Sequence, residues 1–564
     1  MAKTTGAACV ITLLERQGVD LVAGIPGGSN LPLYDALSKS RTIRHVLARH
    51  EQGAGFMAQG LARSTGQVGV CLATSGPGVT NVLTAVADAK LDSIPLVCVT
   101  GQVPQSLIGT DAFQEVDTYG LSIPITKHNY LVRCPEDLLV VIPEAFRLAL
   151  SGRPGPVLVD IPKDVQAREM DVPDWPEPGH ADPLPGPDRQ AVRRAAALLN
   201  AAQRPMLCLG GGVVHSGASD AARSLVEKAG LPTVMTLMGL GALPVEHPLS
   251  LGMLGMHAAR SANIALEECD LLLVAGARLD DRATGLASRF CPKAAIIHID
   301  IDAVEIDKIK KAHLGLAADV GLTLAELLSL VQDRPRPQWL ARVAELRRIH
   351  PPRAVSSDPR SAVGIIRQVA ALVDQDTTVV ADVGQNQMWT AQAYPFARPR
   401  RWLASGGLGT MGFGLPTAIG AALARPGQRV VCFTGDGGLL MNIQELATAV
   451  EQQVDLTVVV LDNNALGLVR QQQNLFYGQR LFGSQYSLAV DFAAVARGFG
   501  MQAFDLAQGG DPGVVLAQAL SGRGPRLVRV PIAAEEAVFP MVPPGAANIN
   551  MIGDMIGGES YARA

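Results

Sequence analysis

Short apolar runs that alternate with longer amphipathic segments are the feature that most constrains how this chain can fold. The runs at residues 21–25, 68–73, 96–100 and 157–161 have the length and the Val, Leu and Ile content of strands buried on both faces. Such strands form parallel sheets when helical segments separate them, because a parallel pair needs a long crossover connection. The alternation recurs further along the chain, at 206–209, 271–277, 296–302, 378–382, 430–434 and 456–461. We therefore expect an α/β protein with doubly wound parallel sheets.

Prolines divide the chain of 564 residues into three regions. Six prolines between residues 173 and 187 exclude a helix or a sheet interior there, and Pro351 and Pro352 mark a second break. Three domains are expected for a chain of this length. We predict an N-terminal domain over 1–170, a linker over 171–189, a central domain over 190–350, a third domain over 360–535, and a C-terminal tail or lid over 536–564.

The charge and the cysteines of the chain exclude several classes of protein. With 48 Lys plus Arg against 52 Asp plus Glu and no run of five like charges, neither nucleic acid nor a membrane is an expected partner. The eight cysteines lie too far apart for a disulfide framework or a CxxC metal site. The uncharged window 402–424 contains six glycines and Pro416, which argue against a membrane-spanning helix. We expect a cytoplasmic enzyme.

Two polar strand ends indicate a site for a metal and a diphosphate. Gly-Asp-Gly at 435–437 follows the run 430–434, and Asp-Asn-Asn at 462–464 follows the run 456–461, with a helix expected over 442–452. In a right-handed βαβ unit both strand ends open on the same edge of the sheet. Asp436 and an Asn amide oxygen then converge as hard ligands for Mg²⁺ or Ca²⁺, and the glycines leave backbone amides free for a diphosphate. Either half alone is most simply a turn, whereas both together favour the site.

This pair of motifs resembles the GDG…NN signature of thiamine diphosphate enzymes. From Gly24 to Asn548 the chain also resembles the large catalytic subunit of acetohydroxyacid synthase (acetolactate synthase). The segments that carry this resemblance are GIPGGSNLPLYDAL (24–37), RHEQGAGFMAQG (49–60), SGPGVTN (75–81), GTDAFQEVDTYG (109–120), PITKHNYLV (124–132), GRPGPVLVDIPKD (152–164), GQNQMWTAQ (384–392) and GLGTMGFGLP (407–416).

The resemblance implies thiamine diphosphate, Mg²⁺ and FAD as cofactors. It implies that pyruvate is decarboxylated and that its hydroxyethyl unit passes to a second 2-ketoacid, either pyruvate or 2-ketobutyrate. The products, 2-acetolactate and 2-aceto-2-hydroxybutyrate, belong to the biosynthesis of valine, leucine and isoleucine. It also implies a homodimer or homotetramer in which thiamine lies between the first domain of one subunit and the third of another, and a small regulatory subunit as a further partner.

Four catalytic residues follow from the same resemblance. Glu51 corresponds to the carboxyl group that hydrogen-bonds the aminopyrimidine ring of thiamine and exchanges a proton with it, the alternative being an ion pair with Arg49. Gly28 offers a backbone amide beside the substrate, although packing alone would also explain a glycine there. Gln114 and Lys127 are implied to line the same pocket and to donate hydrogen bonds to the substrate. For Lys127 a surface salt bridge is the alternative.

The implied ligands of the metal are Asp436, Asn463 and the backbone carbonyl of Ala465, with Asn464 as the less favoured alternative to Asn463. Asn386 stands where relatives commonly have His, and it can donate to a phosphate but carries no charge. The residues implied to contact thiamine diphosphate are Gln385, Asn386, Gly409, Met411, Gly435, Asp436, Gly437, Gly438, Asn463, Ala465 and Gly467.

The central domain has no GxGxxG fingerprint, so NAD is not expected. The resemblance implies FAD there instead, without a net redox task. Leu279 and Ala258 depart from the Phe and Gly that the family prefers. The residues implied to bind FAD are Arg153, Gly211, Gly212, Thr236, Leu237, Gly255, Met256, His257, Gly276, Arg278, Asp280, Asp300 and Asp319.

Three residues are implied to bind substrate. Arg282 resembles the arginine that receives the carboxylate of the second 2-ketoacid, a task suited to a planar guanidinium, and its alternative is a salt bridge to Asp280 or Asp281. Phe113 is placed beside the substrate. Gln472 stands where many relatives have a Trp that favours 2-ketobutyrate.

Two other interpretations stay open on the sequence. An FAD-dependent pyruvate oxidase is built on the same three domains, and a catalytically silent paralogue would also keep the fold. The segments GTDAFQEVD, PITKHN and LDDR resemble the synthase, and the presence of Glu51, Asp436 and Asn463 together argues against a silent copy.

Overall fold

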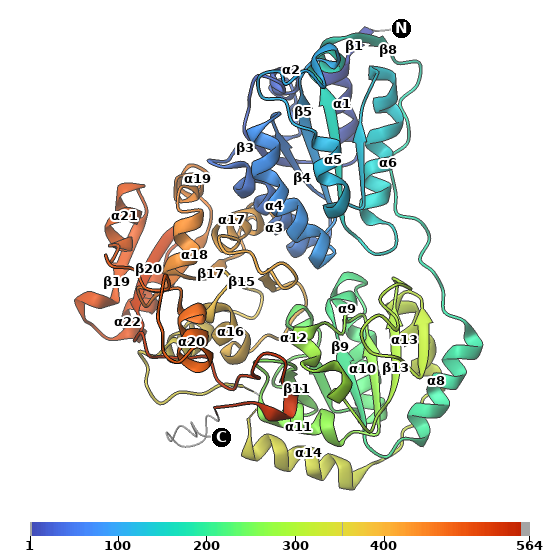
Figure 1. Cartoon of the computed structure of the whole chain (residues 1–564), viewed down its shortest axis with the longest axis vertical. Helices are drawn as coiled ribbons and strands as arrows, with labels where there is room; N and C mark the ends of the chain where they lie inside the picture. The colour runs from blue at the N-terminus through green and yellow to red at the C-terminus, as the bar shows by residue number, and fades with distance from the viewer. Residues whose placement is uncertain (1–2, 352, 554–564) are drawn as a thin grey trace.

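The computed structural model of the chain describes residues 3–351 and 353–553. These residues form three domains, each built around a six-stranded sheet (Figure 1). Within the three sheets every neighbouring pair of strands is parallel. The predicted fold class of doubly wound parallel sheets is therefore confirmed.

Domain 1, drawn in blue and cyan in Figure 1, has the strand order β3 (Arg44–Leu47), β2 (Leu21–Gly24), β4 (Gly69–Ala73), β5 (Leu96–Gln102), β7 (Pro156–Pro162) and β6 (His128–Leu131). Its helices are α1 (Gly6–Arg16), α2 (Leu31–Leu37), α3 (Glu51–Thr65), α4 (Pro77–Asp92), α5 (Thr118–Ser122), α6 (Leu138–Leu150) and α7 (Lys163–Ala167). A separate antiparallel pair joins β1 (Lys3–Thr5) to β8 (Glu169–Asp171). No helix or strand is formed between Asp171 and Arg189, where the prolines lie.

Domain 2, drawn in green, has the strand order β11 (Ser250–Met253), β10 (Thr233–Met235), β9 (Pro205–Leu209), β12 (Leu271–Ala275), β13 (Ala295–Asp300) and β14 (Leu314–Ala317). Its helices are α8 (Arg189–Ala201), α9 (Gly211–His215), α10 (Ser219–Ala229), α11 (Arg260–Glu268), α12 (Asp281–Thr284), α13 (Val320–Leu330) and α14 (Pro337–Ile349). The strand order reverses between β9 and β12, as in dinucleotide-binding folds, and ligands of such sheets bind at this switch point.

Domain 3, drawn in orange and red, has the strand order β16 (Trp402–Ala404), β15 (Thr378–Ala381), β17 (Val430–Gly435), β18 (Leu456–Asp462), β20 (Arg526–Pro531) and β19 (Gln502–Asp505). Its helices are α15 (Ala362–Leu372), α16 (Gln385–Ala393), α17 (Gly414–Ala424), α18 (Asp436–Met441), α19 (Glu445–Glu451), α20 (Gly467–Phe476), α21 (Phe492–Gly498) and α22 (Pro512–Ser521). Domains 1 and 3 have the same strand order when the strands of each domain are numbered along the chain. In both sheets, for example, the second strand forms one edge and lies beside the first.

Domains 1 and 3 are joined by the packing of α3 on α17. A Cβ atom on Gly60 would lie 2.1 Å from the carbonyl oxygen of Thr417, and one on Gly420 would lie 1.9 Å from that of Met57. Glycine is therefore required at both positions, because the backbones of the two helices touch there. The window 402–424 thus divides into β16 and the packed helix α17. No helix in the described part of the chain is long and apolar enough to cross a bilayer.

The segment after β20 leaves domain 3 and runs along domain 2, where it is drawn in dark red beside β11 (Figure 1). The amide of Val542 donates to the carbonyl of Met256 over 2.8 Å, and the Asn548 side chain donates to the carbonyl of Ala283 over 2.8 Å. The part of the expected tail up to Gly553 therefore connects domain 3 to domain 2 through these hydrogen bonds. Residues 554–564 of that tail lie outside the described residues.

Candidate active site

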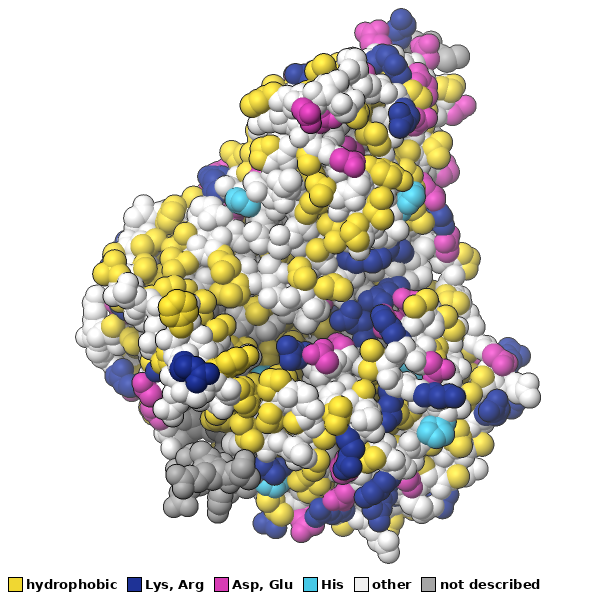
Figure 2. All heavy atoms as spheres, viewed as in Figure 1, with side chains coloured by type: hydrophobic (Ala, Val, Ile, Leu, Met, Phe, Trp, Pro, Cys, Tyr) yellow, Lys and Arg dark blue, Asp and Glu magenta, His cyan; other side chains and the backbone are white. Residues whose placement is uncertain are grey.

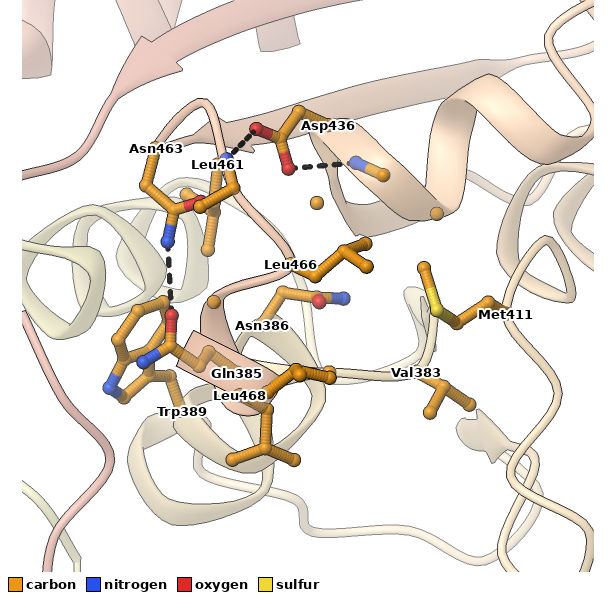
Figure 3. Close-up of a pocket in the computed structure, with 17 residues that line it drawn as sticks. Val383, Gln385, Asn386, Trp389, Met411, Asp436, Leu461, Asn463, Leu466 and Leu468 are labelled. Atoms are coloured by element: carbon orange, nitrogen blue, oxygen red, sulfur yellow. Dashed lines mark hydrogen bonds between the residues drawn. The ribbon is translucent and has the colours of Figure 1, made fainter. Parts of the chain in front are cut away.

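A pocket opens at the carboxyl ends of β15, β17 and β18 in domain 3 (Figure 3). Parallel strands bring their carboxyl ends to one edge, so residues distant in sequence meet there. The pocket brings together ten of the eleven residues expected to contact thiamine diphosphate. Its lining residues are Val383, Gly384, Gln385, Asn386, Trp389, Met411, Gly435, Asp436, Gly437, Gly438, Leu461, Asn463, Ala465, Leu466, Gly467, Leu468 and Val469. Gly409, the eleventh, is exposed in the loop before α17 and has a positive φ of 70°.

Asp436 is the buried carboxylate of this pocket. Its Oδ1 accepts a hydrogen bond from the amide of Gly437 over 2.7 Å, and its Oδ2 accepts one from the amide of Ala465 over 2.9 Å (Figure 3). Burial raises the pKa of Asp436 to about 6, against the opposing effect of these two amides. The carboxylate is thus oriented by the backbone, and a nearby cation would favour its charged form.

The asparagines after β18 separate into two roles. The Asn463 amide donates to Oε1 of Gln385 over 3.0 Å and lies in the pocket, as Figure 3 shows. Asn464 has a positive φ of 54°, and its amide donates to the carbonyl of Tyr486 over 2.9 Å. Asn463 therefore lines the pocket, whereas Asn464 is not one of its lining residues. The Asn386 amide is already used, because it donates to the carbonyls of Asp382 and Phe433.

The charges around the pocket fit a diphosphate held through a cation. None of the described residues that line the pocket is Lys, Arg or His. No group of three or more His, Cys, Asp and Glu side chains in the described ranges could hold a metal by itself. One carboxylate, an amide oxygen and diphosphate oxygens together form the ligand set that Mg²⁺ commonly takes. The residues present therefore fit Mg²⁺ bound together with a diphosphate.

The helix expected over residues 442–452 is corrected by the structure. Two shorter helices occupy this crossover: α18 begins at Asp436 itself, and α19 begins at Glu445. Asn442 interrupts them, with its side-chain amide donating to the carbonyl of Gly412 over 2.7 Å. The early start of α18 places Asp436 and the two following glycines at a helix N-terminus, where backbone amides favour negative charge.

Glu51 lies at the carboxyl edge of the sheet of domain 1, at the first position of α3. Its side chain is 9% exposed, and its Oε2 accepts a hydrogen bond from the Asn81 amide over 2.9 Å. The alternative ion pair with Arg49 is not formed, because Arg49 pairs with Glu451 instead. Sequence reasoning did not single out Asn81 as a partner of Glu51. Its place in the segment SGPGVTN, one turn into α4, was the only signal.

Gly28 follows β2, at the same edge of the sheet as Glu51, and Gln114 lies near Glu51 at the start of α4. A Cβ atom on Gly28 would meet nothing within 4 Å, so packing does not require glycine there. Gln114 has a positive φ of 60°, and its carbonyl oxygen would lie 2.7 Å from a Cβ on Gly76, just before α4. A Cβ on Gly78, in the first turn of the same helix, would lie 3.5 Å from Oε1 of Glu51. The structure thus brings Gln114 and Glu51 to one helix end.

Lys127 does not belong to this group, which corrects the expectation for the single chain. It precedes β6, so it lies at the edge of the sheet opposite to Glu51. Its ammonium group donates to the carbonyls of Leu148 and Ser151, and burial lowers its pKa to about 8. It is half-buried rather than in a surface salt bridge. Lys163, directly after β7, lies at the same edge as Glu51, and the sequence analysis did not single it out.

The residues expected to bind FAD gather at one edge of domain 2, except for Arg153. They lie at or just after the carboxyl ends of all six strands, from Gly211 after β9 to Asp319 after β14. A Cβ on Gly212 would lie 2.7 Å from Cα of Gly276, so the turns after β9 and β12 touch at the switch point. This glycine cradle fits the close approach of a dinucleotide. Burial lowers the pKa of His257, at the same edge, to about 4.

Arg153 reaches this edge from domain 1. Its guanidinium forms ion pairs with Asp302 at 3.2 Å and with Glu305 at 2.7 Å, both just after β13. Figure 2 shows Lys and Arg side chains gathered on the visible face where domain 1 meets domain 2. Arg153 therefore links the two domains beside the expected flavin site.

The residues expected to bind substrate are the least enclosed. Arg282 is exposed and forms a 3.7 Å ion pair with Asp281. This is one of the two salt bridges that the sequence left open as its alternative role. Asp280 instead caps α12 and pairs with Arg278 at 3.6 Å. Phe113 is 88% exposed, and Gln472 is half-buried on α20. None of the three residues expected to bind substrate lines the pocket at the carboxyl ends of β15, β17 and β18.

Family comparisons place this fold and site in one class. Residues 4–121 match the model described as "Thiamine pyrophosphate enzyme, N-terminal TPP binding domain". Residues 192–327 match the "Thiamine pyrophosphate enzyme, central domain", and residues 382–530 match the "Thiamine pyrophosphate enzyme, C-terminal TPP binding domain". The three matches define a thiamine pyrophosphate enzyme.

Curated relatives narrow this class. The chain is 58% identical over 551 residues to the acetolactate synthase isozyme 1 large subunit of Escherichia coli (strain K12), covering 98% of each protein. It is 46% identical to the isozyme 2 large subunit of that organism, covering 97% of this chain and 99% of the relative. It is 44% identical to the probable acetolactate synthase large subunit of Methanocaldococcus jannaschii, covering 97% of this chain and 95% of the relative. The chain belongs to the acetolactate synthase large subunits.

This membership confirms the resemblance drawn from the sequence. It also confirms the expectation of a thiamine diphosphate-dependent enzyme. The pyruvate oxidase alternative is set aside, because the relatives that match over nearly the full length are synthase subunits.

Proposed function

We propose that this protein decarboxylates pyruvate and transfers the resulting hydroxyethyl unit to pyruvate or 2-ketobutyrate in branched-chain amino-acid biosynthesis. The observation that carries the proposal is the buried carboxylate of Asp436, oriented by two backbone amides in a pocket without basic side chains. Such a pocket suits a diphosphate that brings its own cation. Thiamine diphosphate, when bound, supplies the electron sink for decarboxylation and carbon–carbon bond formation.

Separate residues of the chain would hold the metal, bind the diphosphate and transfer the proton. Asp436, Asn463 through its side-chain oxygen, and Ala465 through its carbonyl would hold Mg²⁺, while the amides at the start of α18 would neutralise part of the diphosphate charge. Glu51 would hold or release a proton at the aminopyrimidine ring. Asn81, which donates to Glu51, would keep its carboxyl group in one orientation.

A complete site would need two copies of the chain. All lining residues of the diphosphate pocket lie between Val383 and Val469, in domain 3. Asn81, which bonds to Glu51, and Gly78, which lies beside it, belong to domain 1. Following the family resemblance, we assign the site to domain 1 of one subunit and domain 3 of another, in a homodimer or a pair of dimers. The name "large subunit" carried by the relatives supports a smaller regulatory subunit as a further partner.

FAD would lie along the carboxyl edge of domain 2, with Arg278 and Asp300 among its contacts. The glycine contact between the turns after β9 and β12 supports this assignment. Arg282 projects from the same edge and would receive the carboxylate of the second 2-ketoacid. All eight cysteines are free thiols, in keeping with the proposed cytoplasmic location, where disulfides are rare.

The proposed function is tested by supplying the purified protein with pyruvate, thiamine diphosphate, Mg²⁺ and FAD. Acetolactate should accumulate, and its formation should depend on both thiamine diphosphate and Mg²⁺. Formation of acetate linked to an electron acceptor, without acetolactate, would contradict the proposal.

A further inference from the structure

A buried cluster of three charged side chains lies where all three domains meet. The guanidinium of Arg63 on α3 contacts Asp88 at 2.8 Å and Asp92 at 2.9 Å, both on α4. The three side chains are 3%, 0% and 1% exposed, respectively. Two carboxylates with one guanidinium leave one negative charge uncompensated. A buried carboxylate is costly unless it accepts further hydrogen bonds. The residues that donate these hydrogen bonds therefore indicate which part of the protein the cluster holds in place.

The further donors come from one loop of domain 3. The amides of Gly406 and Gly407 donate to the Asp92 carboxylate over 3.1 and 2.7 Å. The hydroxyl groups of Ser405 and Thr410 donate to Oδ2 of Asp88, the latter over 2.9 Å. The two aspartates of domain 1 therefore organise residues 405–410 of domain 3, which we call the cofactor loop.

The cofactor loop leads directly into the diphosphate pocket. Met411, the next residue, lines that pocket together with Asp436 (Figure 3). Beyond it, the amides of Gly412 and Gly414 donate to the buried Asp382 over 3.0 and 2.8 Å. Met411 thus stands between two anchors: Asp382 of domain 3, and the pair Asp88 and Asp92 of domain 1.

The same loop also touches domain 2. A Cβ on Gly406 would lie 2.4 Å from the sulfur of Met238, and the indole of Trp402, on the strand β16 that precedes the loop, donates to the carbonyl of Leu237 over 3.0 Å. A cluster that served only to hold domains 1 and 3 together could be apolar at lower cost, as the packing of α3 on α17 is. Fully satisfied polar networks instead fix one conformation of the groups that they bind.

We propose that Asp88 and Asp92 are positioning residues for thiamine diphosphate, which hold the cofactor loop so that Met411 stands in the diphosphate pocket. Neither aspartate lines that pocket. Their loss should therefore weaken cofactor binding through the loop, while the chemical step at saturating cofactor is largely kept. This inference rests on the proposed function, because it takes the pocket to be the thiamine diphosphate site.

The experiment compares the variants Asp92→Asn and Thr410→Val with the wild-type protein. Asp92→Asn places an amide donor where the loop amides need an acceptor. Thr410→Val removes one hydroxyl donor on the loop side, keeps the shape of the side chain and leaves the charged cluster intact. Binding of thiamine diphosphate with saturating Mg²⁺ is measured by titration calorimetry, and by the change in tryptophan fluorescence, to which Trp389 in the pocket wall contributes. The rate constant kcat is measured at saturating cofactor.

We expect each variant to raise the Kd of thiamine diphosphate by about tenfold, which corresponds to ~1.4 kcal/mol, with kcat changed less than about threefold. The matched control is Val86→Ala, a buried position on α4 between the two other core positions Ala85 and Ala89. It should lower the thermal stability, as loss of core methyl groups does, but leave the Kd unchanged.

Each outcome decides a different point. An unchanged Kd in both variants, or an equal rise in Val86→Ala, overturns the positioning role. If Asp92→Asn gives no cooperative thermal transition, the comparison of Thr410→Val with the control decides alone. A wild-type protein that does not bind thiamine diphosphate refutes the assignment of the pocket itself, and thereby the proposed function rather than this inference.

Discussion

The carboxylate of Asp436 accepts a hydrogen bond from the backbone amide of Ala465 across 2.9 Å, and this contact ties the end of β17 to the loop after β18. Both residues lie in the diphosphate pocket. A βαβ unit brings the carboxyl ends of its two strands to the same edge of the sheet, and this hydrogen bond joins them directly.

The first prediction concerns the metal. Asp436→Ala removes a hard oxygen ligand and its charge beside the diphosphate, so affinity for thiamine diphosphate in the presence of Mg²⁺ should fall by about 10²-fold or more. Titration calorimetry with and without Mg²⁺ measures this. The control Asp376→Ala removes an exposed carboxylate of the same domain that pairs with Arg398, and should bind normally. Equal cofactor affinity in Asp436→Ala and wild type would show that Asp436 is not the ligand.

The second prediction concerns proton transfer. Glu51→Gln keeps the shape of the side chain but cannot exchange a proton, so kcat should fall by about 10² while the cofactor still binds. Steady-state rates together with cofactor binding measure the two effects. Glu227→Gln, an exposed position in domain 2, serves as the control. Wild-type turnover in Glu51→Gln would refute its assignment.

A third prediction tests whether two subunits share each site. Glu51→Gln and Asp436→Ala should each be nearly inactive, but subunit exchange between them should create mixed dimers with one intact site. Random pairing leaves about one site in four intact, so about a quarter of wild-type activity should return. If both residues act within one chain, every site in the mixture carries a substitution and no activity returns.

The fourth prediction concerns the choice of acceptor. Pyruvate and 2-ketobutyrate differ by one methylene, which a hydrophobic pocket discriminates by only ~1 to 3 kcal/mol. Gln472 offers less apolar contact than a Trp, so the wild-type protein should use the two acceptors nearly equally per unit concentration. Gln472→Trp should raise the preference for 2-ketobutyrate by several-fold in a competition assay, whereas Gln472→Asn should not. A wild-type preference of tens of fold for 2-ketobutyrate would mean that another side chain forms the specificity wall.

The fifth prediction concerns stability and pH. Asp160 lies on β7 and is fully buried; it accepts a hydrogen bond from the Thr100 hydroxyl of β5 over 2.6 Å, and burial raises its pKa to about 7. The folded protein therefore binds this proton more tightly than the unfolded chain, whose Asp pKa is ~3.9. The contribution of Asp160 to the free energy of unfolding should thus fall as pH rises from about 4 to about 7.

Thermal unfolding at several pH values checks this contribution. The Tm difference between wild type and Asp160→Asn should shrink, or turn in favour of the variant, as the pH rises from about 5 to about 8. Asp164→Asn, which alters an exposed carboxylate on α7 that accepts a hydrogen bond from Gln105, should show no such trend. A Tm difference that is constant over this range would contradict the assignment.

The sequence allowed the fold and much of the site to be predicted, because both depend on local patterns. Short apolar runs separated by helical segments dictate parallel sheets, and parallel sheets bring strand ends together. The residues around Asp436 and those at the carboxyl edge of domain 2 therefore meet as expected. Their place was fixed by the strand that each one follows.

Other features depended on contacts that no local pattern contains. Lys127 precedes its strand, so the same topological rule puts it at the edge away from Glu51, although the family resemblance grouped the two. The interruption of the crossover helix at Asn442 depends on its bond to Gly412, 30 residues earlier in the chain. The cluster of Arg63 with Asp88 and Asp92 belongs to no motif. The loop residues that donate hydrogen bonds to its aspartates lie more than 300 positions further along the chain.

The central claim is most directly tested by the product balance of an anaerobic reaction with labelled pyruvate as the only substrate. The protein, loaded with thiamine diphosphate, Mg²⁺ and FAD, should release one CO₂ for every two pyruvate molecules consumed and form one acetolactate, without reducing an added quinone. One CO₂ for each pyruvate, with acetate and reduced quinone as the other products, would contradict the account.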